Sequence, residues 1–98
     1  MIILNPTTTQ HIVNIPIRNY DLSNLHNFEL YDEDKRANIT VVVDNKSQNL
    51  GLISYSLTAT LVEGKEYRVK IIDDVLDTIL YRGKAFATSK NIQNYQNG

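Results

Sequence analysis

The clearest pattern in the chain is a strict alternation from Ile53 to Leu61, in which every odd position is apolar and every even position is serine or threonine. Successive side chains of a β-strand point to opposite faces of the sheet. A period of two therefore predicts a strand with one buried face and one face in water.

The same alternation recurs in four shorter segments, each with its apolar positions on one parity. These positions are His11, Val13, Ile15 and Ile17; Phe28 and Leu30; Ile39, Val41 and Val43; and Tyr67, Val69 and Ile71. Stretches rich in Asn, Asp and Gly separate them, at 19–24, 32–36, 44–49 and 63–65, and such residues favour turns. No window carries an apolar stripe with helical spacing, and 73–80 would form a single helical turn at most.

The stretch from Thr78 to Thr88 is less regular, because its apolar parity changes across Gly83. Ile79 and Tyr81 precede the glycine, and Phe86 follows it. We expect a β-bulge at Gly83, the alternative being a two-stranded ribbon that turns there. Short strands spaced by about 8 to 12 residues predict an all-β fold: a small antiparallel β-sandwich of about seven strands, immunoglobulin-like or fibronectin-III-like.

A chain of 98 residues has room for one domain. Residues 10–89 contain all the strand signals and are expected to form the sandwich. Residues 1–9 are expected to be an N-terminal arm, and 90–98, an amide-rich segment, a polar tail. Ile2 and Tyr95 are the side chains these two ends could offer to a neighbouring protein.

One motif has a structural meaning. Leu61 is followed three positions later by Gly64, and Gly64 three positions later by Tyr67 at the start of an alternating segment. In immunoglobulin-like sandwiches a tyrosine at the start of the penultimate strand hydrogen-bonds the preceding backbone, which is called a tyrosine corner. The alternative is an ordinary turn before a strand that begins with tyrosine.

Composition and charge limit the classes of partner and of metal site that we expect. The formal net charge is −1, so no strong field would attract a polyanion, and nucleic acid is not expected as a partner. Cysteine is absent, which excludes disulfides and cysteine-ligated zinc. The start of the chain has no basic segment and carries Pro6, so we expect no signal peptide, and no apolar run reaches the roughly 18 residues of a membrane span. We therefore expect synthesis inside a cell, without insertion into a membrane.

No catalytic constellation can be assembled from these residue types. His11 and His26 are the only histidines, and His11 shares the parity of apolar neighbours, which favours a structural role over zinc ligation. No serine lies in a Gly-x-Ser-x-Gly turn. We therefore expect no enzyme activity, no catalytic residue and no cofactor.

Carboxylates cluster at 32–34 and at Asp73, Asp74 and Asp77. Sandwich loops with this composition sometimes bind calcium through several oxygens. Lys35 and Arg36 follow the first cluster directly and partly neutralise it. Solvated turns are the favoured interpretation of both clusters, and no metal site is predicted.

Four cations fall on polar positions of two neighbouring segments. Arg68 and Lys70 alternate with apolar residues, and Arg82 and Lys84 flank a glycine. If the two segments pair, the outer face of the sheet would carry a basic stripe, our candidate interface. The alternative role of these cations is to protect exposed strands from aggregation.

Five segments together resemble small immunoglobulin-like virion proteins of crAss-like and related tailed bacteriophages. They are Met1–Thr9, Ile15–Arg18, Phe28–Asp34, Glu63–Tyr67 and Ile79–Thr88. The resemblance implies a structural protein that is made in the host cytoplasm and located in the virion, either an auxiliary or decoration protein on the capsid or a head or tail adaptor. Its partners would be other virion proteins.

A second function remains open, a carbohydrate-binding or adhesive β-sandwich module. Such a module would present solvent-facing aromatic rings clustered on one face. The chain has no tryptophan, and its six tyrosines are scattered, which favours protein partners.

Overall fold

The computed structural model describes residues 2–17 and 21–89. These residues form eight strands and no helix, which confirms the all-β prediction. The strands are β1 (Ile2–Leu4), β2 (Gln10–Ile15), β3 (His26–Asp32), β4 (Ala37–Ile39), β5 (Val42–Asn49), β6 (Leu52–Thr58), β7 (Glu66–Asp73) and β8 (Thr78–Ala87).

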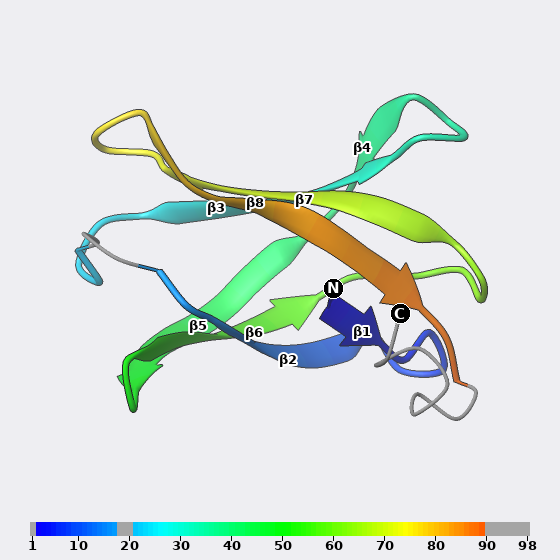
Figure 1. The fold of residues 1–98 in the computed structure, drawn as a ribbon, viewed down its shortest axis with the longest axis horizontal. Coiled ribbons are helices and arrows are strands. Elements are labelled where there is room, and N and C mark those ends of the chain that lie inside the picture. Colours follow the sequence, from blue (N-terminus) through cyan, green and yellow to red (C-terminus); the bar gives the residue numbers. More distant parts are fainter. Residues whose placement is uncertain (1, 18–20, 90–98) are drawn as a thin grey trace.

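The strands are arranged in two layers (Figure 1). One sheet has five strands in the order β1-β8-β7-β3-β4, and the other has three in the order β2-β6-β5. Every pair is antiparallel except β1 with β8, which is parallel. The expectation of a purely antiparallel fold was therefore wrong at the first strand.

That first strand also corrects the prediction of an N-terminal arm at 1–9. Residues Ile2–Leu4 pair with Ala85–Ala87 of β8, and the Leu4 side chain is buried in the core. The Thr88 N–H donates to the Leu4 carbonyl oxygen at 2.8 Å. The beginning of the chain is thus an integral edge of the five-stranded sheet, and the predicted tail at 90–98 lies outside the described residues.

The core lies between the two sheets and consists mainly of the apolar side chains that alternate along the predicted strands. The odd positions from Ile53 to Leu61 are all buried. Across from them, Phe28 of β3 meets Tyr55 of β6 edge to face, with ring centroids 5.6 Å apart. Burial of one complete face of each central strand fixes the register, because a one-residue slip would expose that face.

Two predicted boundaries were wrong around β4 and β5. Ile39, Val41 and Val43 were expected in one strand, but Ile39 ends β4 in one sheet and Val43 lies in β5 of the other. The polar segment 44–49, expected as a turn, continues β5 along the edge of the three-stranded sheet. An edge strand has solvent on several sides, so its sequence need not alternate.

The turn that follows β5 is a tight one. Leu50 and Gly51 both have positive φ, 51° and 79°, and connect Asn49 directly to Leu52 of β6. Two consecutive left-handed residues are characteristic of a type I′ hairpin, which favours Asn-Gly. Leucine is an unusual choice at the first position, and its side chain is 95% exposed.

The bulge in β8 lies three residues earlier than predicted. Ile71 faces Tyr81 and Ile72 faces Ile79, so the extra residue is Leu80, while Gly83 pairs regularly with Val69. Gly83 has a different role: a Cβ at this position would lie 2.6 Å from the Tyr81 hydroxyl oxygen. The glycine leaves room for the tyrosine ring.

Several connections between strands lie at two opposite ends of the molecule (Figure 1). The β5–β6 and β7–β8 turns and residues 21–25, which precede β3, lie at one end. The N-terminal strand and the β3–β4 and β6–β7 connections lie at the other.

Candidate functional site

The outer face of the five-stranded sheet brings the four predicted cations together. β7 and β8 pair, so Arg68 lies directly opposite Lys84, and Lys70 directly opposite Arg82. We call these four residues the basic stripe. The predicted condition for its existence, pairing of the two strands, is met.

Three carboxylates compensate much of this charge. Arg68 Nε lies 2.7 Å from Glu33 Oε1, Lys84 Nζ lies 3.2 Å from Glu66 Oε1, and Lys70 Nζ lies 3.8 Å from Glu29 Oε1. Sequence analysis missed these partners because Glu29 and Glu33 lie far from the cations along the chain. Only the pairing of β3 with β7 brings them close.

Arg82 differs from its three neighbours. Within the described part of the chain it has no ion pair, although Lys70, a like charge, lies directly across the strand. Like charges on directly opposed residues of a sheet repel. Arg82 is therefore the cation of the stripe that gains most from an added anion.

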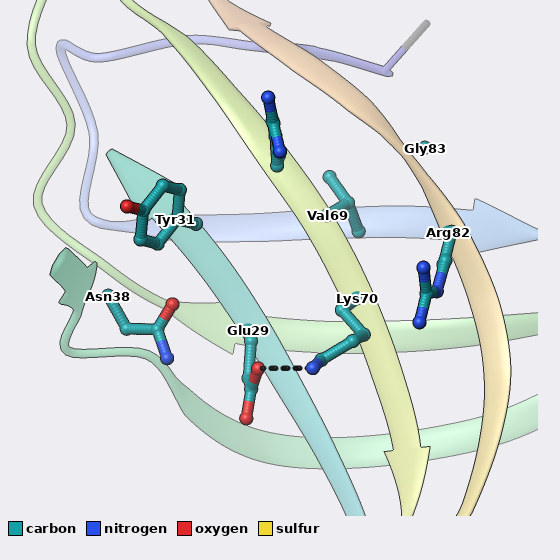
Figure 2. A pocket seen from close by; sticks show the side chains of 8 residues that line it. Glu29, Tyr31, Asn38, Val69, Lys70, Arg82 and Gly83 are labelled. Atoms are coloured by element: carbon teal, nitrogen blue, oxygen red, sulfur yellow. Dashed lines mark ion pairs between the residues drawn. The ribbon is translucent and has the colours of Figure 1, made fainter. Parts of the chain in front are cut away.

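A shallow depression of about 430 Å³ opens on this face. Figure 2 shows it, with the Lys70–Glu29 pair at its centre and Arg82 on the neighbouring strand. Its lining consists of Glu29, Tyr31, Asn38, Arg68, Val69, Lys70, Arg82 and Gly83. We call it the basic depression, because three of these residues are cations and one is an anion.

The depression is well supplied with hydrogen-bonding groups. The Tyr31 hydroxyl and the Asn38 side-chain amide have no hydrogen-bond partner among the described residues. The Arg68 guanidinium donates to Glu33 through Nε, and its two terminal nitrogens donate to none of the described residues. Chemically, the site suits an anionic group surrounded by further polar atoms.

The predicted corner residues lie at and just before the start of β7. The Tyr67 hydroxyl accepts a hydrogen bond from the Val62 N–H at 3.2 Å, and Leu61 and Tyr67 are both buried. Gly64 has a φ of 81°, and its N–H donates to the Ala87 carbonyl oxygen at 2.7 Å. The expected contact of Tyr67 with the preceding backbone is present, and the Gly64 hydrogen bond joins the same connection to β8.

Both histidines contact backbone carbonyl oxygens in the interior. His11 Nε2 lies 3.2 Å from the Ala59 carbonyl oxygen. His26 Nε2 lies 3.0 Å from the Asp21 carbonyl oxygen, and its Nδ1 lies 2.9 Å from the Tyr55 hydroxyl. A carbonyl only accepts, so a neutral His26 carries its proton on Nε2 and accepts from Tyr55 through Nδ1.

The two carboxylate clusters lie in the β3–β4 and β7–β8 turns, which have the same hydrogen-bonding pattern. Asp32 Oδ1 accepts from the N–H groups of Asp34 and Lys35, at 3.0 and 3.3 Å. Asp73 Oδ1 accepts from those of Val75 and Leu76, at 2.9 and 3.0 Å. In each turn the first residue is a buried aspartate, and the fifth has a positive φ, 54° at both Arg36 and Asp77.

Each buried aspartate also accepts a hydrogen bond from a more distant side chain. The Lys65 ammonium, 2.9 Å from Asp32 Oδ2, holds the pKa of Asp32 below its usual range, and Asp32 raises the pKa of Lys65 in return. The Asn24 amide, 2.9 Å from Asp73 Oδ2, holds the pKa of Asp73 below its usual range, and the Leu76 N–H acts in the same direction.

Other candidate groups are placed as follows. Ile2 lies in β1 and packs partly against the core, while Tyr95 falls outside the described residues. Among residues 2–17 and 21–89, no three His, Cys, Asp or Glu side chains come close enough to hold a metal ion. The same residues contain no helix that is long and apolar enough to cross a membrane.

Comparison of the chain with protein-family models, with curated proteins and with solved structures finds no match.

Proposed function

We propose that this chain is a non-enzymatic interaction protein with an immunoglobulin-like sandwich. The strand order supports the fold: β2-β6-β5 corresponds to strands B, E and D, and β8-β7-β3-β4 to G, F, C and C′. The first strand then runs along the last. The hydrogen bond from Val62 to Tyr67 at the start of the penultimate strand agrees with the same assignment.

The observation that carries the proposed function is the basic depression with its uncompensated Arg82. An open, shallow surface with three cations, an amide and a phenol is suited to contact with an acidic protein surface. Arginine and tyrosine are also the residue types that commonly dominate binding energy at protein interfaces. Recognition without turnover is the role that this surface supports.

The assembly that we propose is the virion of a tailed bacteriophage. The support for it is the sequence resemblance to small immunoglobulin-like virion proteins. On this proposal, the chain is an auxiliary protein on the capsid or an adaptor at the head or tail. An acidic surface of another virion protein would then meet the basic stripe.

A carbohydrate ligand is a second candidate, favoured by Tyr31 and Asn38, which line the depression and whose side-chain polar atoms have no hydrogen-bond partner among the described residues. One aromatic ring among the lining residues is a small platform for a sugar. Glycan-array binding that is lost in Tyr31→Ala and kept in Arg82→Glu would support this candidate over the first.

The test of the first candidate is co-sedimentation with phage particles that lack the protein. Arg82→Glu should reduce bound protein about tenfold or more, and the loss should shrink as salt is raised. Lys35→Glu is the matched control, an exposed charge reversal at the β3–β4 turn outside the depression. Equal binding of wild type and Arg82→Glu would refute this use of the depression.

A further inference from the structure

The β7–β8 turn forms an exposed, acidic and apolar projection at one end of the five-stranded sheet (Figure 1). We call Asp74–Asp77 the acidic tip. We propose that the acidic tip of one copy of this chain docks in the basic depression of a second copy, so that copies associate head to tail. This inference rests on the proposed function, because it gives the same depression a second acidic partner, another copy of this chain.

The apolar part of the tip has no cover in the described structure. Val75 and Leu76 are 64% and 66% exposed. Leu25, which is 64% exposed, lies at the base of the tip, where its carbonyl oxygen accepts from the Asp74 N–H at 2.8 Å. Exposed aliphatic side chains that gather in one patch commonly mark a contact surface.

The tip is held in shape before any contact is made. The Asp73 carboxylate accepts hydrogen bonds from the backbone of Val75 and Leu76, and Asn24 donates to the same carboxylate. A projection fixed in this way loses little conformational freedom on binding. It can therefore bind with fewer contacts than a mobile loop would need.

The charges of tip and depression are complementary. Asp74 and Asp77 are exposed and have no ion pair among the described residues, and no lysine or arginine occurs from Asp73 to Tyr81. The lining of the depression carries three cations and one carboxylate. Asp74 or Asp77 would supply the anion that Arg82 lacks, while Leu76 covers the aliphatic stems of Lys70 and Arg82.

The contact has to be intermolecular. Lys70 and Arg82 pair within the same hairpin that ends in the tip, and the ladder pairs at Ile71, Ile72 and Asp73 separate them from it. The hairpin cannot fold back on its own outer face. A contact between two different surfaces of identical chains is heterologous, and it generates rings or open rows of subunits.

The experiment is sedimentation velocity on the isolated protein over a range of concentrations at low salt. The wild-type weight-average mass should rise with concentration, and added salt should reduce it. A tip variant, Leu76→Ser with Asp74→Lys, and a depression variant, Arg82→Glu, should each need at least about tenfold more protein to reach the same mass. Ile12→Thr and Lys35→Glu are matched controls outside both surfaces and should behave as wild type.

A mixture of the two defective variants provides the decisive test of head-to-tail contact. The tip variant keeps an intact depression and the depression variant keeps an intact tip, so the mixture should form one-to-one dimers that neither variant forms alone. A monomeric wild type, or self-association without dimers in the mixture, would overturn the proposal. Loss of particle binding by Arg82→Glu alongside a monomeric wild type would leave the proposed function standing and remove this inference alone.

Discussion

Tyr31 and Tyr67 lie on opposite faces of the five-stranded sheet and differ in what their hydroxyl groups contact. The Tyr67 hydroxyl is the acceptor for the Val62 N–H, whereas the Tyr31 hydroxyl has no partner among the described residues. We predict that Tyr67→Phe lowers the free energy of unfolding by about 1 kcal/mol, the usual value of one such hydrogen bond. Tyr31→Phe should leave the urea midpoint unchanged, and equal effects of the two changes would contradict this account of Tyr67.

Leu50 adopts a backbone conformation that is unfavourable for leucine. Its φ of 51° is a left-handed conformation, which costs most L-residues roughly 1 to 2 kcal/mol and asparagine much less. Since the side chain is 95% exposed, its removal loses no packing. We predict that Leu50→Asn raises the urea midpoint, while Leu50→Ala, which keeps the unfavourable φ, does not.

Among the elements, the β3–β4 and β7–β8 turns depend on ionised aspartates. An aspartate in the unfolded chain has a pKa of about 3.9, and those of Asp32 and Asp73 are lower in the folded protein. The unfolded state therefore binds more protons as pH falls through this range, so the stability that both groups contribute is present above about pH 4 and is lost below it.

We predict that the free energy of unfolding of the wild type, from urea titrations, falls steadily as pH is lowered below about 4. Asp73→Asn should be less stable at neutral pH, because both carboxylate oxygens accept hydrogen bonds and an amide nitrogen in place of one of them cannot, and its decline in acid should be shallower. Parallel pH profiles of variant and wild type would show that Asp73 is not one of the titrating groups.

Strands with one buried face could be predicted from sequence, because β2, β3, β6 and β7 must place every second side chain in the core. β5 could not, because most of its residues lie exposed along a sheet edge and follow no parity. β1 and β4 have three residues each, too few for a period to emerge. The bulge was assigned to Gly83 because glycine often marks one, but the tyrosine ring beside it explains that glycine.

For the candidate site, as for the strands, alternation predicted which face a side chain lies on but not which residues lie next to it. Alternation placed Arg68 and Lys70 on an outer face, and they lie there. The acidic partner Glu29 and the uncompensated state of Arg82 depend on which residues of β3, β7 and β8 come opposite one another. That register is set by packing of the whole core, so no local pattern reveals it.

For the molecule as a whole, the first strand contributes more than was expected of an arm. Leu4 is only 4% exposed, and removing a buried leucine side chain costs about 2 to 5 kcal/mol. We predict a loss in this range for Leu4→Ala in chemical denaturation, and a loss within about 0.5 kcal/mol for Ile12→Ala, whose side chain is 72% exposed. Comparable losses would mean that β1 adds little to the core.

The parallel pairing of β1 with β8 also determines when during synthesis and folding β1 can find its partner strand. Leu4 and Ala87 face each other although they are 83 positions apart in the sequence, so a ribosome makes the partner of β1 long after β1 itself. A contact between such distant segments adds to contact order, and its loop-closure entropy favours formation late in folding. During synthesis the chain must therefore carry an unpaired apolar strand, Ile2–Leu4, which is free to join a neighbouring nascent chain until its own β8 arrives.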